Sequence, residues 1–225
     1  MSLRISVSDL ETYRYWKDSE DSTLADLVAR LTKKDPPTPQ MEAGRAFAKF
    51  MEHVRTGSVI DAATVDGWEF IFALDAELAL PPVRELKAEV VLETPSGQVT
   101  LVGMTDGIDG AIHDQKLTES LDAERYLDSL QWRAYLCMFG AKEFVYDIFL
   151  AKYERGPGHT NEDGTYVKGP PTGKITVTEY HPLRFYTYPN IQADVQRAVN
   201  DLAEVIVSFG IPKTMADRAT EKGAS

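Results

Sequence analysis

Residues 99–118 read VTLVGMTDGIDGAIHDQKLT. An apolar, β-branched run opens this stretch, Gly110 interrupts it, and residues 112–118 form a second short run. Two such runs around a glycine-containing turn predict an antiparallel β-hairpin. The elements before and after this hairpin in the chain are the ones expected to flank it.

Charged side chains are concentrated on the predicted hairpin. Side chains alternate along a strand, so Asp114 and Lys116 share one face, and a turn centred near Gly110 places Asp106 across the ladder from Asp114. Two nearby carboxylates repel each other, and a divalent cation is the simplest partner for such a pair. The alternative is that Asp106, Asp109 and Asp114 are solvated turn and edge residues, with Lys116 as their surface ion-pair partner.

Composition indicates one globular domain in a reducing compartment. The 225 residues are 43% hydrophobic and 26% charged, which suits one domain with a substantial core. The lone Cys137 can form no internal disulfide and no cysteine-held zinc or iron–sulfur site. No signal segment and no apolar run of about 18 residues is present, which predicts a cytoplasmic protein without membrane contact. The net charge of −11 argues against a general polyanion binder, but local basic groups leave DNA binding open.

Helices are predicted before the hairpin, and a strand leads into it. Ser6 or Ser8 is a plausible N-cap for a first helix, and Thr38 followed by Pro39 is a good start for a second, which runs to about residue 56. Residues 58–80 are apolar and aromatic and have no clear assignment. A strand at 86–93 and a turn at 95–97 then lead into the hairpin, which gives three consecutive antiparallel strands.

A helix capped by Ser120 and ended by Gly140 is predicted after the hairpin. Its expected buried stripe comprises Leu121, Leu127, Leu130, Ala134, Cys137 and Met138. Strands at 143–152 and 174–180 form a long hairpin, and a last helix runs from Asn190 to Gly210, with Phe209 at the end of its apolar stripe. The polar tail, 211–225, is expected to be disordered.

Three short motifs occur in this order. Gly103-Met104-Thr105-Asp106 lies on the second strand, Asp114-Gln115-Lys116 lies on the third, and Gln131 to Tyr135 on the next helix reads Gln-x-x-x-Tyr. This order resembles the PD-(D/E)XK nuclease superfamily, in particular the exonuclease branch shared by bacterial recombination helicase-nucleases and phage recombination exonucleases. The Ser-x-x-x-Leu-x-x-Tyr segment at residues 6–13 and Gly44 also resemble the branch. Thr105 stands at the superfamily's nominal proline, and the cysteine cluster of some relatives is absent.

The resemblance implies an α/β fold with a restriction-endonuclease-like core. Its mixed central sheet would be flanked by helices in the order α-β-β-β-α-β. A single nuclease domain would then comprise an N-terminal helical part at about 1–57, a catalytic core at about 84–210 and the tail at 211–225.

The resemblance also implies hydrolysis of DNA phosphodiesters with Mg²⁺ or Mn²⁺ and without an iron–sulfur cluster. Asp106, Asp114 and the backbone carbonyl of Gln115 would hold the metal. Lys116 would orient the attacking water or stabilise developing charge. Gln131 and Tyr135, one helical turn apart, would brace the site or touch the DNA backbone, and simple amphipathic packing is the alternative for Tyr135.

One position departs from the branch. Its members commonly carry a histidine or an acid four residues after the helix glycine, where this chain has Ala48. Glu52 is the nearest substitute, because it lies one turn further along the same stripe, about 6 Å along the axis. The alternative is a solvated Glu52 paired with Lys49 or Arg55.

The predicted function is therefore a metal-dependent DNA exonuclease of the phage or prophage recombination type. A restriction-like endonuclease on the same fold and a non-catalytic member that binds DNA ends or another protein are the alternatives. DNA is the expected partner, with a single-strand annealing protein and further copies of the chain, in a dimer or ring, as additional ones. Asp109 and His113 are expected to point away from Asp114, and His53 is a weaker candidate ligand.

Overall fold

An eight-stranded mixed sheet forms the centre of the molecule. The computed structural model describes residues 2–74 and 80–213. The strand order is β1-β5-β6-β7-β10-β3-β2, and β4 also pairs with β5. The strands are β1 (Ser2–Ser6), β2 (Ala62–Val65), β3 (Trp68–Phe72), β4 (Val83–Thr94), β5 (Gly97–Ile108), β6 (Ile112–Thr118), β7 (Glu143–Arg155) and β10 (Pro171–Tyr186).

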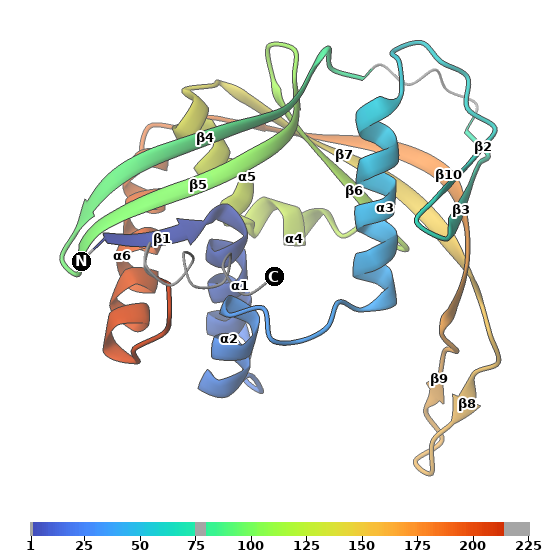
Figure 1. The fold of residues 1–225 in the computed structure, drawn as a ribbon, viewed down its shortest axis with the longest axis horizontal. Helices are drawn as coiled ribbons and strands as arrows, with labels where there is room; N and C mark the ends of the chain where they lie inside the picture. Colours follow the sequence, from blue (N-terminus) through green and yellow to red (C-terminus); the bar gives the residue numbers. More distant parts are fainter. Residues whose placement is uncertain (1, 75–79, 214–225) are drawn as a thin grey trace, which may run out of the picture.

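Helices cover both faces of this sheet (Figure 1). They are α1 (Val7–Asp18), α2 (Leu24–Leu31), α3 (Pro39–His53), α4 (Ala123–Asp128), α5 (Leu130–Phe139) and α6 (Ile191–Ser208). The predicted α/β class with a mixed, helix-flanked sheet is confirmed. The predicted order is reproduced from the first of its three strands onward. Strands β4, β5 and β6 pair antiparallel in sequence, α5 follows, and β7 pairs in parallel with β6.

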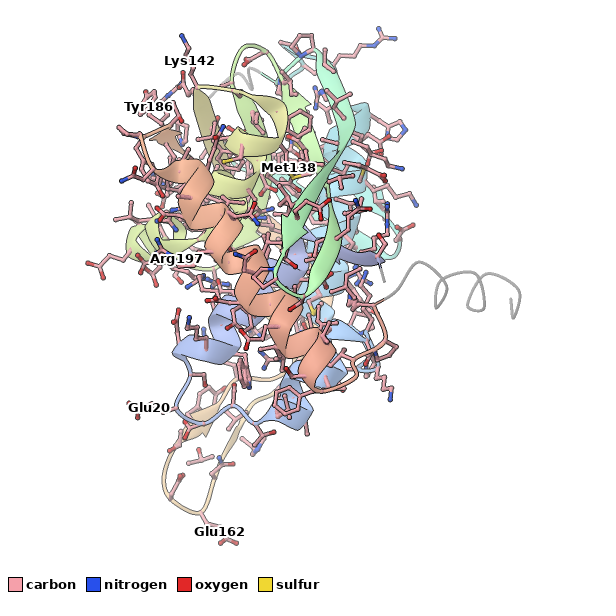
Figure 2. The ribbon with its side chains drawn as sticks, turned by 90° about the vertical axis from the view of Figure 1, so that its left-hand side faces the viewer. Glu20, Met138, Lys142, Glu162, Tyr186 and Arg197 are labelled. Atoms are coloured by element: carbon pink, nitrogen blue, oxygen red, sulfur yellow. The ribbon has the colours of Figure 1, made fainter. Side chains whose placement is uncertain are left out.

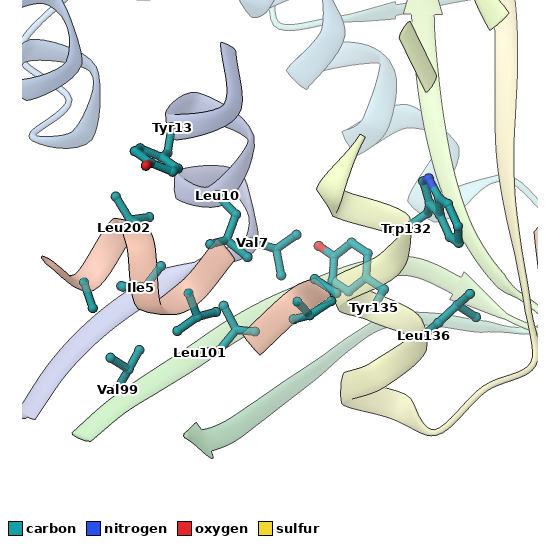
Figure 3. Packing of buried hydrophobic residues seen from close by; sticks show 14 of the residues in the cluster. Ile5, Val7, Leu10, Tyr13, Val99, Leu101, Trp132, Tyr135, Leu136 and Leu202 are labelled. Carbon is teal, nitrogen blue, oxygen red and sulfur yellow. The ribbon is translucent and has the colours of Figure 1, made fainter. Parts of the chain in front are cut away.

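Alternation along β7 divides the core into two clusters. Phe144, Tyr146 and Ile148 pack with β1, α1, α5 and α6, whereas Phe149 and Ala151 pack with α3, β3 and β10. Because successive side chains point to opposite faces of a strand, the two clusters lie on opposite sides of the sheet. Figure 3 shows the first cluster, in which Ile5, Leu101, Tyr135 and Leu202 come from a strand, a second strand and two helices.

The predicted helix starts at Ser6 and Thr38 are confirmed. The Ser6 side chain accepts a hydrogen bond from the backbone of Asp9, whose carboxylate accepts one from the Ser6 backbone, and Thr38 caps α3 at the Met41 amide. The short strand β1, which precedes α1 and pairs in parallel with β5, was not predicted. β2 and β3 occupy part of the segment that had no sequence assignment, of which residues 75–79 lie outside the described residues.

The single helix predicted at residues 120–140 is wrong in its first half. Two helices form, because Ser129 ends α4 and caps α5 with its side chain. Leu121 and Leu127, predicted to be buried, are 39% and 54% exposed, and α5 buries Trp132 and Tyr135 instead. The predicted stop at the glycine after α5 is confirmed by its φ of 61°.

The β7–β10 hairpin is confirmed and extends into an arm. Two short strands, β8 (His159–Thr160) and β9 (Tyr166–Val167), form this arm, and Glu162 lies near its tip (Figures 1 and 2). The last helix is also confirmed, except that Phe209 is 56% exposed rather than part of its buried stripe. The tail from residue 214 lies outside the described residues. Within residues 2–74 and 80–213, no helix is both long and apolar enough to cross a bilayer.

Candidate active site

The β5–β6 ladder ends where the two acids face each other. Gly107 pairs with His113 and Ile108 with Ile112, so continuing the register places Asp106 opposite Asp114. No ladder pair forms there. The Asp106 carboxylate instead accepts a hydrogen bond of 2.6 Å from the backbone N–H of Gln115. The strands therefore separate at this point, and the side chain of Asp106 occupies the opening.

Asp114 is a buried carboxylate with two close side-chain contacts. It is 4% exposed, its Oδ1 accepts 2.7 Å from Gln131 Nε2, and its Oδ2 lies 2.5 Å from Lys116 Nζ. The Lys116 ammonium is the close partner of Oδ2 among the described residues. The alternative of solvated acids is therefore wrong for Asp114.

The three charges perturb one another. Burial and the charge of Asp114 raise the pKa of Asp106 to about 7, against the opposing effects of the Gln115 N–H and of Lys116. Burial also raises the pKa of Asp114, although Lys116 partly offsets it. Burial alone would lower the pKa of Lys116, but the Asp114 carboxylate outweighs it and raises that pKa. A bound cation would relieve the repulsion between the two acids.

The Gln-x-x-x-Tyr motif connects α5 to both strands. Gln131 holds Asp114, and one turn later the Tyr135 hydroxyl donates 2.7 Å to the Met104 carbonyl on β5. Tyr135 is only 5% exposed, and its ring packs on Gly103, where an added Cβ would come within 2.5 Å of ring atom Cε1. Tyr135 thus braces β5 and lies too deep to contact a DNA backbone.

Glu11 on α1 supports this arrangement and was not identified from the sequence. Its Oε1 accepts 2.8 Å from the Ser129 hydroxyl and 2.8 Å from the backbone N–H of Gln131. The Tyr146 hydroxyl lies 2.8 Å from the same serine oxygen and 3.3 Å from Gln131 Oε1. A carboxylate is favourable at the N-terminus of a helix. Because Glu11 lies 120 positions before Gln131 in the chain, no local sequence pattern could have predicted this pairing.

A pocket of about 330 Å³ lies on the α3 side of Asp106. Ala48, Glu52, Glu85 and Gln115 line it together with Asp106. Glu52 thus shares a pocket with one of the two acids. It is an exposed residue, as the alternative predicts, but Lys49 pairs with Asp66 at 2.8 Å rather than with Glu52. Across residues 2–74 and 80–213, no three His, Cys, Asp or Glu side chains converge closely enough to hold a metal ion.

Glu85 also lines this pocket and was not singled out from the sequence. It stands opposite Asp106 between the pairs Arg84–Gly107 and Leu86–Thr105, and its φ of 49° is unusual for a residue other than glycine. The hairpin register alone could have placed it there.

His113 belongs to a separate buried cluster. Its Nδ1 lies 2.8 Å from Asp147, which also accepts 2.6 Å from the Tyr180 hydroxyl, and its Nε2 lies 3.0 Å from Asp109. Burial alone would lower the pKa of His113, but its bonds to the two aspartates raise it. This cluster joins β6 to β7 and β10 and leaves Asp114 to its own partners.

Comparisons with known proteins give structural likenesses with TM-scores below 0.5 and no family. No protein-family model matches the chain, and no curated protein matches it. The protein SSO0001 is 13% identical over 91% of this chain and 75% of its own, with a TM-score of 0.48. LHK-Exo, solved in complex with dAMP, is 13% identical over 98% and 94%, with a TM-score of 0.41. A presumed exonuclease from Eubacterium rectale is 14% identical over 90% and 80%, with a TM-score of 0.49. At these values the likenesses establish no activity for this chain.

Proposed function

We propose that this chain is a Mg²⁺-dependent deoxyribonuclease, an exonuclease of the phage or prophage recombination type. The observation that carries the proposal is the buried Asp114 beside Asp106 and Lys116 at the point where β5 and β6 separate. Burying two carboxylates with raised pKa values beside one lysine costs free energy that a purely structural site would not need to spend.

The residues present suit a hard divalent cation. Carboxylate and carbonyl oxygens are the ligands that Mg²⁺ takes, and Asp114 Oδ2 is a buried carboxylate oxygen beside the Lys116 ammonium. Asp106, Asp114 and the Gln115 carbonyl would hold the metal, which when bound supplies charge neutralisation and a more acidic water. Lys116 would stabilise charge on the phosphate, and Gln131 would keep the Asp114 carboxylate in one orientation.

The test incubates the protein in Mg²⁺ with two substrates, end-labelled linear duplexes and supercoiled circular DNA. We expect loss of nucleotides from linear ends and no cutting of the closed circle. Asp114→Asn retains the size of the side chain and should abolish cleavage. Asp201→Asn, which changes an acid of α6 that pairs with Lys17, is the matched control and should cleave normally. Full activity in the Asp114→Asn enzyme would refute the site.

Products of the same assay separate the alternatives. Cutting of the closed circle would favour a restriction-like endonuclease. Binding to ends without any cleavage in Mg²⁺ or Mn²⁺ would favour a non-catalytic protein.

Glu52 is proposed as an indirect or additional metal partner. It shares the α3 pocket with Asp106, and its carboxylate replaces the acid that Ala48 does not supply. Glu52→Gln should therefore lower activity and raise the Mg²⁺ concentration needed for half-maximal cleavage. Glu42→Gln, in the first turn of the same helix, should change neither value. Identical Mg²⁺ titrations for the two variants would show that Glu52 has no part in the site.

A further inference from the structure

A second pocket opens beside Lys116, on the side of the sheet that α1 and α5 cover. It has a volume of about 310 Å³ and is lined by residues of α1, α4, α5, β6 and β7. Lys116 and Gln131, the two side chains that contact Asp114, both line it, on the face opposite the α3 pocket. Asp106 lines the α3 pocket, whereas Lys116 lines the second pocket.

Three tyrosine rings and an arginine are among the side chains that line this second pocket. Tyr15, Tyr126 and Tyr146 all line it, and the last two rings lie 4.9 Å apart at an angle of 49°. Arg125 donates 2.8 Å from Nε to the Tyr15 hydroxyl and places its guanidinium carbon 5.4 Å from the centre of that ring. Tyrosine rings and guanidinium planes are the surfaces on which unpaired nucleobases stack.

Glu11 occupies the position at the start of α5 where an anion would otherwise bind. The N-terminus of a helix commonly binds an anion through its free N–H groups. Here the Gln131 N–H at the start of α5 and the Ser129 hydroxyl already donate to the Glu11 carboxylate. Its other oxygen is paired with Arg14 at 3.2 Å. The start of α5 is therefore not free to bind an anion, and the cationic side chains that line the pocket are Lys116 and Arg125.

We infer that this pocket binds the nucleobase next to the phosphate that is cut, stacked against Tyr126 and Tyr15. The location of that phosphate, near Lys116, rests on the proposed nuclease function, while the base pocket itself stands on its own residues. A base can enter only if it is unpaired. The preferred substrate is therefore a single-stranded or frayed DNA end.

Binding in EDTA tests the inference without cleavage. The probes are two ten-nucleotide single strands with an internal fluorescein, one intact and one abasic at both terminal positions. Both ends are changed so that the test applies whether the 5′ or the 3′ end enters the pocket. Fluorescence anisotropy should show the wild-type chain binding the abasic strand about tenfold more weakly, a typical effect of one stacked base. Tyr126→Leu should bind the intact strand about tenfold more weakly and should no longer distinguish the two strands.

The matched control is Tyr166→Leu on the β8–β9 arm, an exposed tyrosine that should behave as the wild type. If Tyr126→Leu lowers the thermal stability, Tyr15→Leu, at a more exposed position, replaces it in the comparison. Inorganic phosphate at 10 mM should compete no better than chloride at equal ionic strength.

Equal binding of both strands by the wild type, or competition by phosphate alone, would overturn the base pocket. Such a result would leave the Asp114 assay untouched. Base discrimination without any cleavage would keep the pocket and refute the nuclease, so the two failures can be told apart.

Discussion

Gly103→Ala should destabilise the protein through a contact that joins β5 to α5. The new Cβ would lie 2.5 Å from Tyr135 Cε1 and 3.0 Å from Val7 Cγ2. Carbon atoms pack at about 3.5–4.0 Å, so one of the elements must move by about 1 Å. The Tyr135 ring has little freedom, because its hydroxyl is bonded to the Met104 carbonyl and its face stacks on Phe144 at 8°.

Overpacking of this kind costs about 1–3 kcal/mol. For a chain of this size, each kcal/mol lowers the melting temperature by about 2–4 °C, so a cost near 2 kcal/mol predicts a loss of about 4–8 °C by calorimetry. Gly44→Ala is the matched control, since nothing lies within 4 Å of its added Cβ in α3. That variant should gain about 0.5–1 kcal/mol, because alanine is the better helix former.

A second substitution isolates the contact itself. Tyr135→Leu removes the ring, so Gly103→Ala should destabilise the protein much less in that background. The summed losses of stability of the two single variants should differ from the loss in the double variant by about 1 kcal/mol or more. Unchanged stability of Gly103→Ala, or strict additivity in the double variant, would refute the close packing of the Gly-x-x-Asp strand on the Gln-x-x-x-Tyr helix.

Other perturbations have equally direct readouts. In EDTA, the raised pKa of Asp106, about 7, makes stability fall as pH rises from about 4 through 7, because the folded state holds a proton that the unfolded state has lost. Asp106→Asn should make the melting temperature fall less steeply over this range, and an unchanged slope would contradict the assignment. Lys116→Ala should abolish cleavage yet tighten Mn²⁺ binding in calorimetry, since its ammonium lies 2.5 Å from Asp114; weaker binding would argue against a metal there. Asp147→Asn should lower the free energy of unfolding by about 2 kcal/mol in denaturant, because His113 and the Tyr180 hydroxyl lose a charged acceptor. A loss below about 0.5 kcal/mol would show that the cluster is not needed for stability. Light scattering should show a dimer or ring, which would help an acidic enzyme stay on DNA; a monomer that digests processively would contradict this.

The sequence by itself determined the central hairpin and the positions of its two acids on facing strands. Strand alternation requires Asp114 and Lys116 to share a face, and a turn at Gly110 requires Asp106 to stand opposite Asp114, whatever the rest of the chain does. Helix starts at Ser6 and Thr38 were equally local, because a side-chain cap acts within one helical turn.

Only the tertiary structure decided which groups surround those acids. The burial of Asp114, the bond to Gln131 and the raised pKa values depend on α5 packing across the sheet, which strand periodicity does not encode. Glu11 reaches the start of α5 from more than a hundred positions away and accepts the backbone N–H of Gln131 there. Long-range contacts of this kind are set by how the layers stack, so residue spacing along the chain could not predict them.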